Sequence, residues 1–247
     1  IRRPPRSTLV PYPTLFRSSP LTKADIAAHE TIIRGLATID PEVPVVSEEG
    51  RVGDPKKSEL AWLVDPLDGT KEFIKRNGMF TVNIALMKRM GPLWKPIFGV
   101  VHAPVSRTTW LGGIDVPATR ITDAETSEIS VNRQTNTQTR LVASGSHRAE
   151  RDEKFAKELG EHELVRMGSS LKACVVAEGS ADLYPRFGPT SCWDIAAAHA
   201  VVEAAGGFVI SPQCEPLVYD LVDEVLNPYF LVACSTKWND IWAQNQD

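Results

Sequence analysis

The chain has 247 residues, of which 43% are hydrophobic and 23% charged, and its formal charge is −4 at pH 7. This composition is typical of a soluble globular protein and excludes a disordered or fibrous chain. Acidic and basic residues are mixed, which excludes a basic nucleic-acid tail, and the longest apolar runs are far too short to span a membrane. The four cysteines form no Cys-x-x-Cys pair, which indicates free thiols in a reducing compartment.

The first eighteen residues, IRRPPRSTLVPYPTLFRS, contain four prolines and four arginines. They show neither helical nor strand periodicity. They resemble the translation of a sequencing adapter. We therefore expect residues 1–18 to be non-native and to carry no packed structure, and the native sequence to begin near Ser19 after the loss of an N-terminal segment.

The first half of the chain predicts one helix followed by strands. Apolar periodicity predicts the helix at 22–38. Apolar and β-branched runs predict strands at 43–47, 60–64, 79–87, 96–102 and 106–111. The polar stretch 115–139 predicts a mobile loop and a boundary between two lobes.

The second half predicts alternating strands and helices. Strands are expected at 140–144, 163–167, 181–185, 207–211 and 229–234, and helices at 149–159, 170–178 and 194–205. Strands clustered early and alternation later are typical of a layered α/β protein with two sheets. We expect one catalytic unit built from an N-terminal lobe at 19–139 and a C-terminal lobe at 140–247.

The segment WLVDPLDGT ends an apolar run in two aspartates. In a regular strand Asp65 and Asp68 would point to opposite faces. Pro66 and Gly69 favour a turn that aims both carboxylates and the Leu67 carbonyl at one point. These hard oxygen ligands suit Mg²⁺ or Mn²⁺.

Two more acids can complete this cluster. Glu48 follows an expected strand, and Asp194 begins an expected helix, where the helix dipole favours a carboxylate. Four acids without a counter-ion would repel one another, and a divalent metal removes that repulsion. Taken singly, the Asp-Pro-Leu-Asp-Gly segment is a common turn and Asp194 a helix cap. Taken together they favour metal binding.

Two segments, WLVDPLDGTKEF and WDIAAAHAVVEAAGG, together resemble the signatures of the inositol monophosphatase superfamily of Mg²⁺-dependent, lithium-sensitive phosphatases. The segments SPLTKADIAAHETI, PVVSEE, GSSLKACVVAEGSADLYPRFGP and LNP further resemble its CysQ-type 3′(2′),5′-bisphosphate nucleotidases. The resemblance runs from about Ser19 to about Val232 and is weakest at 103–139. It implies a five-layer α-β-α-β-α sandwich with the metal site where the two sheets meet.

The resemblance also implies roles for individual residues. The metal ligands would be Glu48, Asp65, the Leu67 carbonyl, Asp68 and Asp194, holding about two or three Mg²⁺ ions, with Mn²⁺ as a substitute. Asp25 and Thr70 would orient the attacking water. The substrate would contact Glu48, Leu67, Asp68, Gly69, Thr70, His147, Ser169, Lys172, Arg186 and Asp194. Taken alone, His147 is more simply interpreted as a surface-loop histidine.

The function implied is hydrolysis of the 3′-phosphate of adenosine 3′,5′-bisphosphate to AMP and phosphate, which clears the by-product of sulfate assimilation. The activated sulfate donor carrying the same bisphosphate is a second candidate substrate. The alternatives are an inositol or sugar monophosphatase, and a non-catalytic metal- or phosphate-binding protein inactivated by N-terminal truncation. The expected location is the bacterial cytoplasm, with peripheral association at the inner membrane as a variant, and the oligomeric state stays open.

Overall fold

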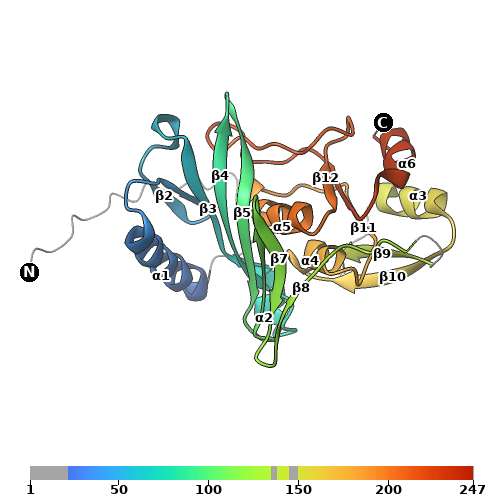
Figure 1. Ribbon diagram of the computed structural model, residues 1–247, viewed down its shortest axis with the longest axis horizontal. Coiled ribbons are helices and arrows are strands. Elements are labelled where there is room, and N and C mark those ends of the chain that lie inside the picture. The colour runs from blue at the N-terminus through green and yellow to red at the C-terminus, as the bar shows by residue number, and fades with distance from the viewer. Residues whose placement is uncertain (1–21, 135–137, 145–149, 247) are drawn as a thin grey trace, which may run out of the picture.

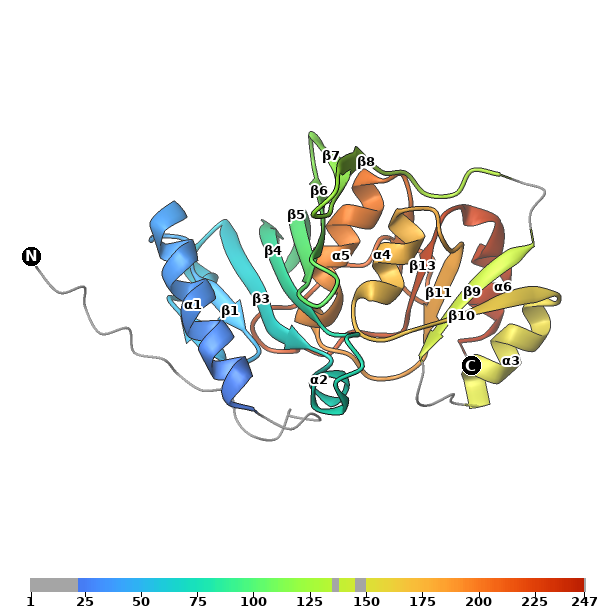
Figure 2. The same ribbon diagram turned by 90° about the horizontal axis from the view of Figure 1, so that it is seen from below.

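Two β-sheets and three layers of helices alternate through the molecule. The computed structural model describes residues 22–134, 138–144 and 150–246, so the segment 1–18 lies outside the described residues. Helix α1 (Lys23–Ile39) covers one outer face, α4 (Leu171–Ala177) and α5 (Cys192–Ala204) lie between the sheets, and α3 (Glu150–Leu159) and α6 (Asn239–Gln244) cover the other outer face. Figure 2 shows these layers in sequence, which confirms the expected five-layer α-β-α-β-α sandwich.

The larger sheet has eight strands in the order β2-β1-β3-β4-β5-β6-β7-β8. These are β1 (Val45–Ser47), β2 (Gly50–Val52), β3 (Leu60–Asp68), β4 (Thr81–Met90), β5 (Leu93–Ala103), β6 (Thr108–Gly113), β7 (Val116–Ile121) and β8 (Thr126–Glu128). Only β1 and β3 pair in parallel, and the other neighbours are antiparallel.

The expectation of an unstructured loop over 115–139 is wrong for β7 and β8. β8 is the edge strand of the larger sheet and β7 lies next to it, where one face is open to solvent. A strand with one open face needs few apolar side chains, because backbone pairing and a single inward residue, such as Ala118 of β7, can hold it. The polar, Thr-rich composition of this stretch is therefore compatible with strand formation.

The smaller sheet has the order β10-β9-β11-β13-β12. Its strands are β9 (Thr139–Ser144), β10 (His162–Met167), β11 (Leu183–Arg186), β12 (Phe208–Ile210) and β13 (Phe230–Ala233). The short helix α2 (Thr70–Lys75) and two 3₁₀ helices, Pro55–Lys57 and Thr236–Trp238, complete the regular structure of the described residues. No helix in the described part of the chain is long and apolar enough to cross a membrane.

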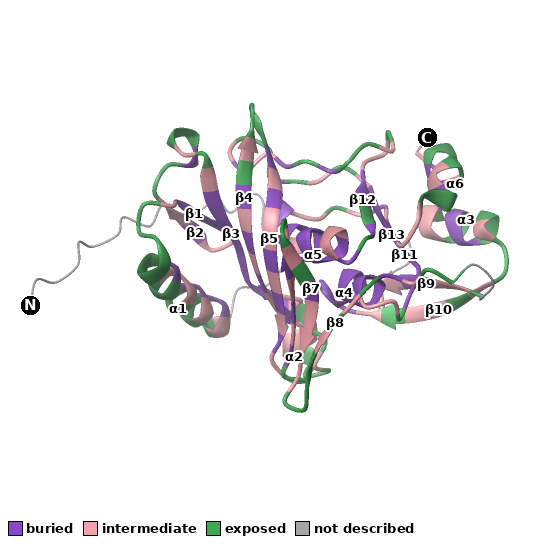
Figure 3. Cartoon of the chain, viewed as in Figure 1, coloured by how far each residue is buried: buried purple, intermediate pink, exposed green. Residues whose placement is uncertain are grey.

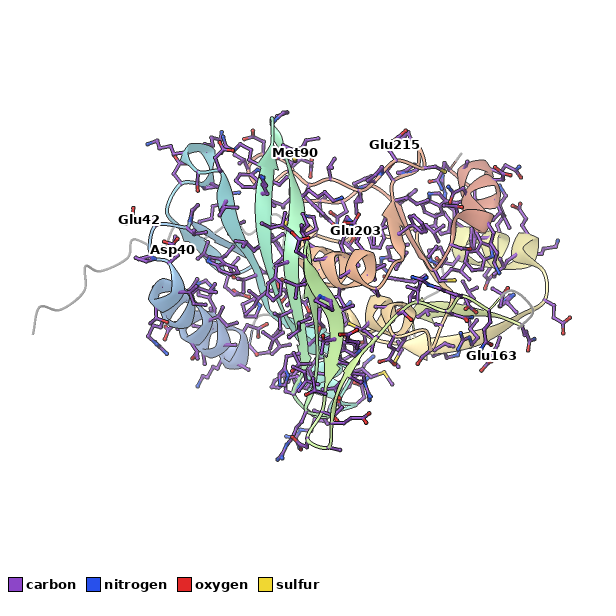
Figure 4. All side chains as sticks on the ribbon, viewed as in Figure 1. Asp40, Glu42, Met90, Glu163, Glu203 and Glu215 are labelled. Atoms are coloured by element: carbon purple, nitrogen blue, oxygen red, sulfur yellow. The ribbon has the colours of Figure 1, made fainter. Side chains whose placement is uncertain are left out.

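Helix α5 is the central element of the fold, and it is largely buried between the two sheets (Figure 3). At its C-terminal end, Glu203, labelled in Figure 4, pairs with Lys95 at 3.1 Å and with His199 at 3.2 Å. The buried His199 ring also bonds the Tyr219 hydroxyl at 2.8 Å. These contacts fix the C-terminal end of α5. Asp194 lies at the other end, and its position depends on how closely the helix packs on the larger sheet.

Close packing of α5 on β5 depends on Gly99. A Cβ atom at this position would lie 2.0 Å from the carbonyl oxygen of Ala197 in α5. We predict that Gly99→Ala lowers the free energy of unfolding by at least about 2 kcal/mol, because the helix and sheet must separate. Gly35→Ala is the matched control: it lies on the exposed side of α1 with nothing within 4 Å of the added carbon.

The control should raise the free energy of unfolding by about 0.5–1 kcal/mol, since alanine favours a helix more than glycine does. Urea unfolding followed by circular dichroism measures both variants. Equal effects of the two substitutions would contradict the close approach of α5 to β5.

Candidate active site

A β-bulge brings the two aspartates of the WLVDPLDGT segment to one face of the larger sheet. We expected a turn from Pro66, but β3 continues to Asp68. Asp65 pairs with Asn83 and Asp68 pairs with Thr81, so three steps along β3 match two along β4. This extra residue shifts the alternation of side chains by one and places both carboxylates on the same side. The Leu67 amide donates to the Asp65 carboxylate at 2.9 Å and holds the bulge.

Thr70 and Asp25 meet beside this bulge. Gly69, with φ of 91°, turns the chain into the short helix α2 (Thr70–Lys75). The Thr70 hydroxyl lies 3.5 Å from Oδ1 of Asp25 and 3.4 Å from the Leu67 carbonyl oxygen. The other Asp25 oxygen accepts a hydrogen bond from the Thr22 amide at 2.8 Å in the capping box of α1. Asp25 is therefore held by its own helix while one of its oxygens faces the hydroxyl.

Glu48 and Asp194 approach the same place from other elements. Glu48 lies in the turn between β1 and β2, and its amide donates to the Val64 carbonyl at 3.1 Å. Asp194 lies in the first turn of α5, where its carboxylate accepts from the Ser191 amide at 3.0 Å. Both line a cavity of about 220 Å³ together with Asp65, Leu67, Asp68, Gly69 and Thr70. We call this the acidic cavity.

The acids of this cavity repel one another. Burial raises the pKa of Asp65 well above its usual value, and the charges of Glu48, Asp68 and Asp194 raise it further. Burial, and then the charge of Asp68, raises the pKa of Asp194 to about 8. Burial also raises the pKa of Asp68, although Lys172 and hydrogen bonds from Ser170 lower it in part. These four carboxylates thus line the cavity together with Glu72 and two cationic side chains, Lys71 and Arg186, and the pKa values of Asp65, Asp68 and Asp194 stay raised.

A divalent cation fits this donor set. The donors are carboxylate and carbonyl oxygens, which Mg²⁺ prefers, and a cation among them would relieve their repulsion. In the described residues, no three acidic, histidine or cysteine side chains lie close enough together to hold a metal ion as they stand. The fit therefore rests on the shared cavity and on the chemistry of its donors.

A second cavity of about 170 Å³ adjoins the first, and the residues that line both are Asp68, Gly69, Glu72, Arg186 and Asp194. We call it the cationic cavity, because Lys172 and Arg186 line it with Ser169 and Tyr184. The Lys172 ammonium donates to the Ser169 carbonyl at 2.6 Å and lies 5.4 Å above the Tyr184 ring.

Lys172 and Arg186 share the lining of the cationic cavity with three acids, Asp68, Glu72 and Asp194. Burial lowers the pKa of Lys172 to about 8, although the Asp68 carboxylate opposes this shift. Arg186 donates from Nη2 to the Pro189 carbonyl at 3.0 Å, and its buried Nε has no hydrogen-bond partner among the described residues. An anion bound here would therefore find two cationic side chains. His147, the remaining predicted substrate contact, lies outside the described residues.

Two site residues were missed from the sequence. The Ser170 amide donates to Asp68 at 2.6 Å, and its hydroxyl donates to the Asp194 carbonyl at 2.5 Å. Asn83 donates to the Ser170 hydroxyl at 2.9 Å and lies 3.5 Å from Asp68. A signal existed for Asn83, because it is a polar residue in the otherwise apolar start of β4. Ser170 could not be distinguished from its neighbour Ser169 by sequence.

Comparison with known proteins decides the family. Residues 17–239 match the family model described as the inositol monophosphatase family. The chain belongs to the inositol monophosphatase family. Proteins of this family are generally metal-dependent, which agrees with the donor set of the acidic cavity. The resemblance drawn from the signature segments is thereby confirmed.

Within the family, the chain is similar to proteins named CysQ. The 3′(2′),5′-bisphosphate nucleotidase CysQ of Escherichia coli K12 is 47% identical over 222 residues, which cover 87% of this chain and 86% of the relative. The CysQ protein of Haemophilus influenzae is 32% identical over 92% of this chain and 86% of its own length. The crystal structure of CysQ from Bacteroides thetaiotaomicron superposes with a TM-score of 0.76 at 38% identity, covering 88% of this chain and 86% of that one.

Proposed function

We propose that this protein is a metal-dependent 3′(2′),5′-bisphosphate nucleotidase, which hydrolyses the 3′-phosphate of adenosine 3′,5′-bisphosphate to give AMP and phosphate. The observation that carries the proposal is the pair of adjoining cavities, which share Asp68, Asp194 and Arg186, with Lys172 lining the second cavity alone. A substrate with two phosphates needs a metal-binding site for the one that is cleaved and a separate cationic site for the other. The relatives named CysQ carry this activity in their name and support the same assignment.

In this proposal Glu48, Asp65, Asp68, Asp194 and the Leu67 carbonyl would hold about two or three Mg²⁺ ions, which Mn²⁺ can replace. When bound, these ions supply positive charge to the phosphate and to the leaving oxygen. The Thr70 hydroxyl accepts a hydrogen bond from the attacking water and donates its own to Asp25, 3.5 Å away. Asp25 thereby holds the pair in the orientation in which the water's lone pair faces phosphorus.

The phosphate that is not cleaved would bind in the cationic cavity. Lys172 and Arg186 supply its charge partners, and Ser169 supplies a hydroxyl at the border with Gly69. Ser169 adopts a φ of 45°, an uncommon backbone conformation for a residue with a side chain. Such conformations cluster where binding geometry matters, which supports a role for this turn in substrate binding. His147 stays a predicted contact to the nucleotide.

The alternatives are less well supported. An inositol or sugar monophosphatase has no need of the buried Lys172 beside Arg186, because its substrate carries one phosphate. A non-catalytic metal-binding protein has no need of a carboxylate paired with the Thr70 hydroxyl. The activated sulfate donor, which carries the same bisphosphate, stays a candidate second substrate.

Lys172→Met should remove the preference for a substrate with a second phosphate. We predict that the KM for adenosine 3′,5′-bisphosphate rises about 10- to 100-fold, because a charge-assisted hydrogen bond is lost. The KM for 3′-AMP, which lacks the 5′-phosphate, should change by less than about 3-fold. Steady-state phosphate release from the two substrates measures this difference, with Lys157→Met on α3 as the control. A Lys172→Met variant that keeps the full preference would remove the basis of the nucleotide assignment.

We also propose a cytoplasmic location. All four cysteines lie in the described residues and are unpaired, two of them only partly buried, as expected of a protein from a reducing compartment. Peripheral membrane association and lithium sensitivity stay predictions, and lithium inhibition can be measured in the same phosphate-release assay.

A further inference from the structure

The segment 221–227, between β12 and β13, contacts the chain beside two predicted metal ligands, Glu48 and Asp194. We call this segment the strap. It lies against the residues that precede α5, where Asp194 begins the helix, and against β2, which follows the turn of Glu48. The segment LNP, which carries part of the family resemblance, lies at its end and has no role in the chemistry described above.

The strap holds the peptide groups ahead of α5. The Asn227 amide donates to the Thr190 carbonyl at 2.8 Å, and the Asn227 side chain donates to the Ser191 carbonyl at 2.8 Å. The Cys192 amide donates to the Val225 carbonyl at 2.8 Å. The Ser191 amide remains, and it donates to the Asp194 carboxylate at 3.0 Å. The strap therefore holds both peptides that flank Ser191: the Asn227 backbone bonds the one that carries the Ser191 amide, and the Asn227 side chain bonds the one that follows it.

The other end of the strap is fixed by Arg51 of β2. Its Nη2 donates to the Leu221 carbonyl at 2.8 Å and to the Val222 carbonyl at 3.0 Å. The strap is itself firmly placed, since Leu221 is fully buried and the Val222 amide donates to the Asp220 carboxylate at 2.7 Å. Arg51 follows Glu48 by three positions, on the far side of the tight turn between β1 and β2.

We infer that the strap sets the separation between Glu48 and Asp194 before metal binds, and that Asn227 and Arg51 are positioning residues for metal binding. This inference rests on the proposed function, because it takes the acidic cavity as the metal site. The two ligands come from different layers of the sandwich, and in the described residues the strap joins their supporting segments by direct hydrogen bonds. Polar partners that orient metal ligands contribute strongly to affinity, and their loss typically weakens metal binding about 10- to 100-fold.

Direct binding of Mn²⁺ to the substrate-free protein tests this inference. Electron paramagnetic resonance titration reports free Mn²⁺, so it needs no activity. We expect Asn227→Ala and Arg51→Ala each to raise the Mn²⁺ dissociation constant about 10-fold or more. Since both act through one segment, the double variant should lose less than the product of the two single effects.

Asn132→Ala is the matched control, because the half-buried Asn132 side chain also holds a loop, donating to Asp182 at 2.6 Å, but lines neither cavity. It should bind Mn²⁺ as the wild type does, even where its melting temperature falls as much as that of Asn227→Ala. Circular dichroism identifies variants that are folded, and if Asn227→Ala is not, the Arg51→Ala result decides alone.

The outcomes distinguish a failure of the proposed metal site from a failure of the proposed role of the strap. If the wild type binds no Mn²⁺, the metal site of the proposed function is wrong and the inference is lost with it. If the wild type binds Mn²⁺ and the strap variants bind it equally well, the inference is wrong while the proposed function stands. A loss of Mn²⁺ affinity in Asn132→Ala equal to that in the strap variants would also overturn the inference. It would show that any loss of stability weakens Mn²⁺ binding, wherever the substitution lies.

Discussion

Replacing Asp65 with asparagine should abolish phosphate release and at the same time stabilise the metal-free protein. Asp65 is buried, and burial together with three neighbouring acids raises its pKa well above the usual value. As a proposed metal ligand it would be needed for catalysis, so we expect a loss of at least about 1,000-fold in kcat/KM. Without metal, burial and repulsion of its charge outweigh the hydrogen bond from the Leu67 amide, so Asp65→Asn should raise the free energy of unfolding at pH 8 by about 1–2 kcal/mol.

The pH dependence of stability follows from the same shifts. Folding raises the pKa of Asp194 from 3.8 to about 8, so between these pH values the folded protein retains a proton that the unfolded chain releases. The free energy of unfolding of the metal-free protein, measured in EDTA, should therefore fall as the pH rises through this range. Asp65→Asn should make the fall shallower, and saturating Mg²⁺ should remove most of it in the wild type.

Urea unfolding in EDTA at pH 5, 6.5 and 8 provides the measurement. Asp182→Asn is the control, because it should change the free energy of unfolding in the opposite direction to Asp65→Asn. Burial alone would raise the pKa of Asp182, but hydrogen bonds from Arg140 and Asn132 outweigh burial and lower it. Removing its charge should destabilise the protein at all three pH values. A metal-free protein that gains stability as the pH rises, or that is destabilised by Asp65→Asn, would contradict the arrangement of acids described here.

Thr70→Ala should lower kcat about 100- to 10,000-fold, the range typical of lost acid–base assistance. The hydroxyl lies 3.5 Å from Asp25, and no other described side chain presents a hydroxyl to Asp25 from the acidic cavity. Because Thr70 would contribute no carboxylate to the metal ions, Mn²⁺ affinity should change by less than about 3-fold. Steady-state kinetics and Mn²⁺ titration of the same preparation separate the two effects.

Two companion variants sharpen this prediction. Thr70→Ser keeps the hydroxyl and should retain activity within about 10-fold. Asp25→Asn in the Thr70→Ala background should cause little further loss, since residues that act as a unit are not additive. A Thr70→Ala enzyme with half the wild-type kcat would show that the hydroxyl does not orient the attacking water.

Much of the fold was predictable, because its longer elements have clear apolar patterns. Helix α1 and strands β9 to β13 lie within two residues of the positions expected from sequence. Strands β7 and β8, at one end of the larger sheet, were missed, since they form by backbone pairing with β6 and with each other more than through apolar content. The short elements β2 and α2 were missed because they are stabilised by tertiary contacts more than by local propensity.

The candidate site was predictable in composition but not in geometry. The acidic residue types and their segments are visible in the sequence. The bulge that aligns Asp65 with Asp68 is not, because it is defined by their partners Asn83 and Thr81 on another strand. The same holds for Ser170, whose role appears only when its amide lies 2.6 Å from Asp68, far away in the chain.

The most direct test of the two-cavity account is ³¹P NMR of adenosine 3′,5′-bisphosphate during incubation with the enzyme and Mg²⁺. The account predicts that the 3′-phosphate signal disappears, that inorganic phosphate rises in equal amount, and that the 5′-phosphate signal persists as AMP. EDTA should stop the reaction. Persistence of both ester signals under conditions in which the folded protein binds Mn²⁺, or release of the 5′-phosphate first, would contradict it.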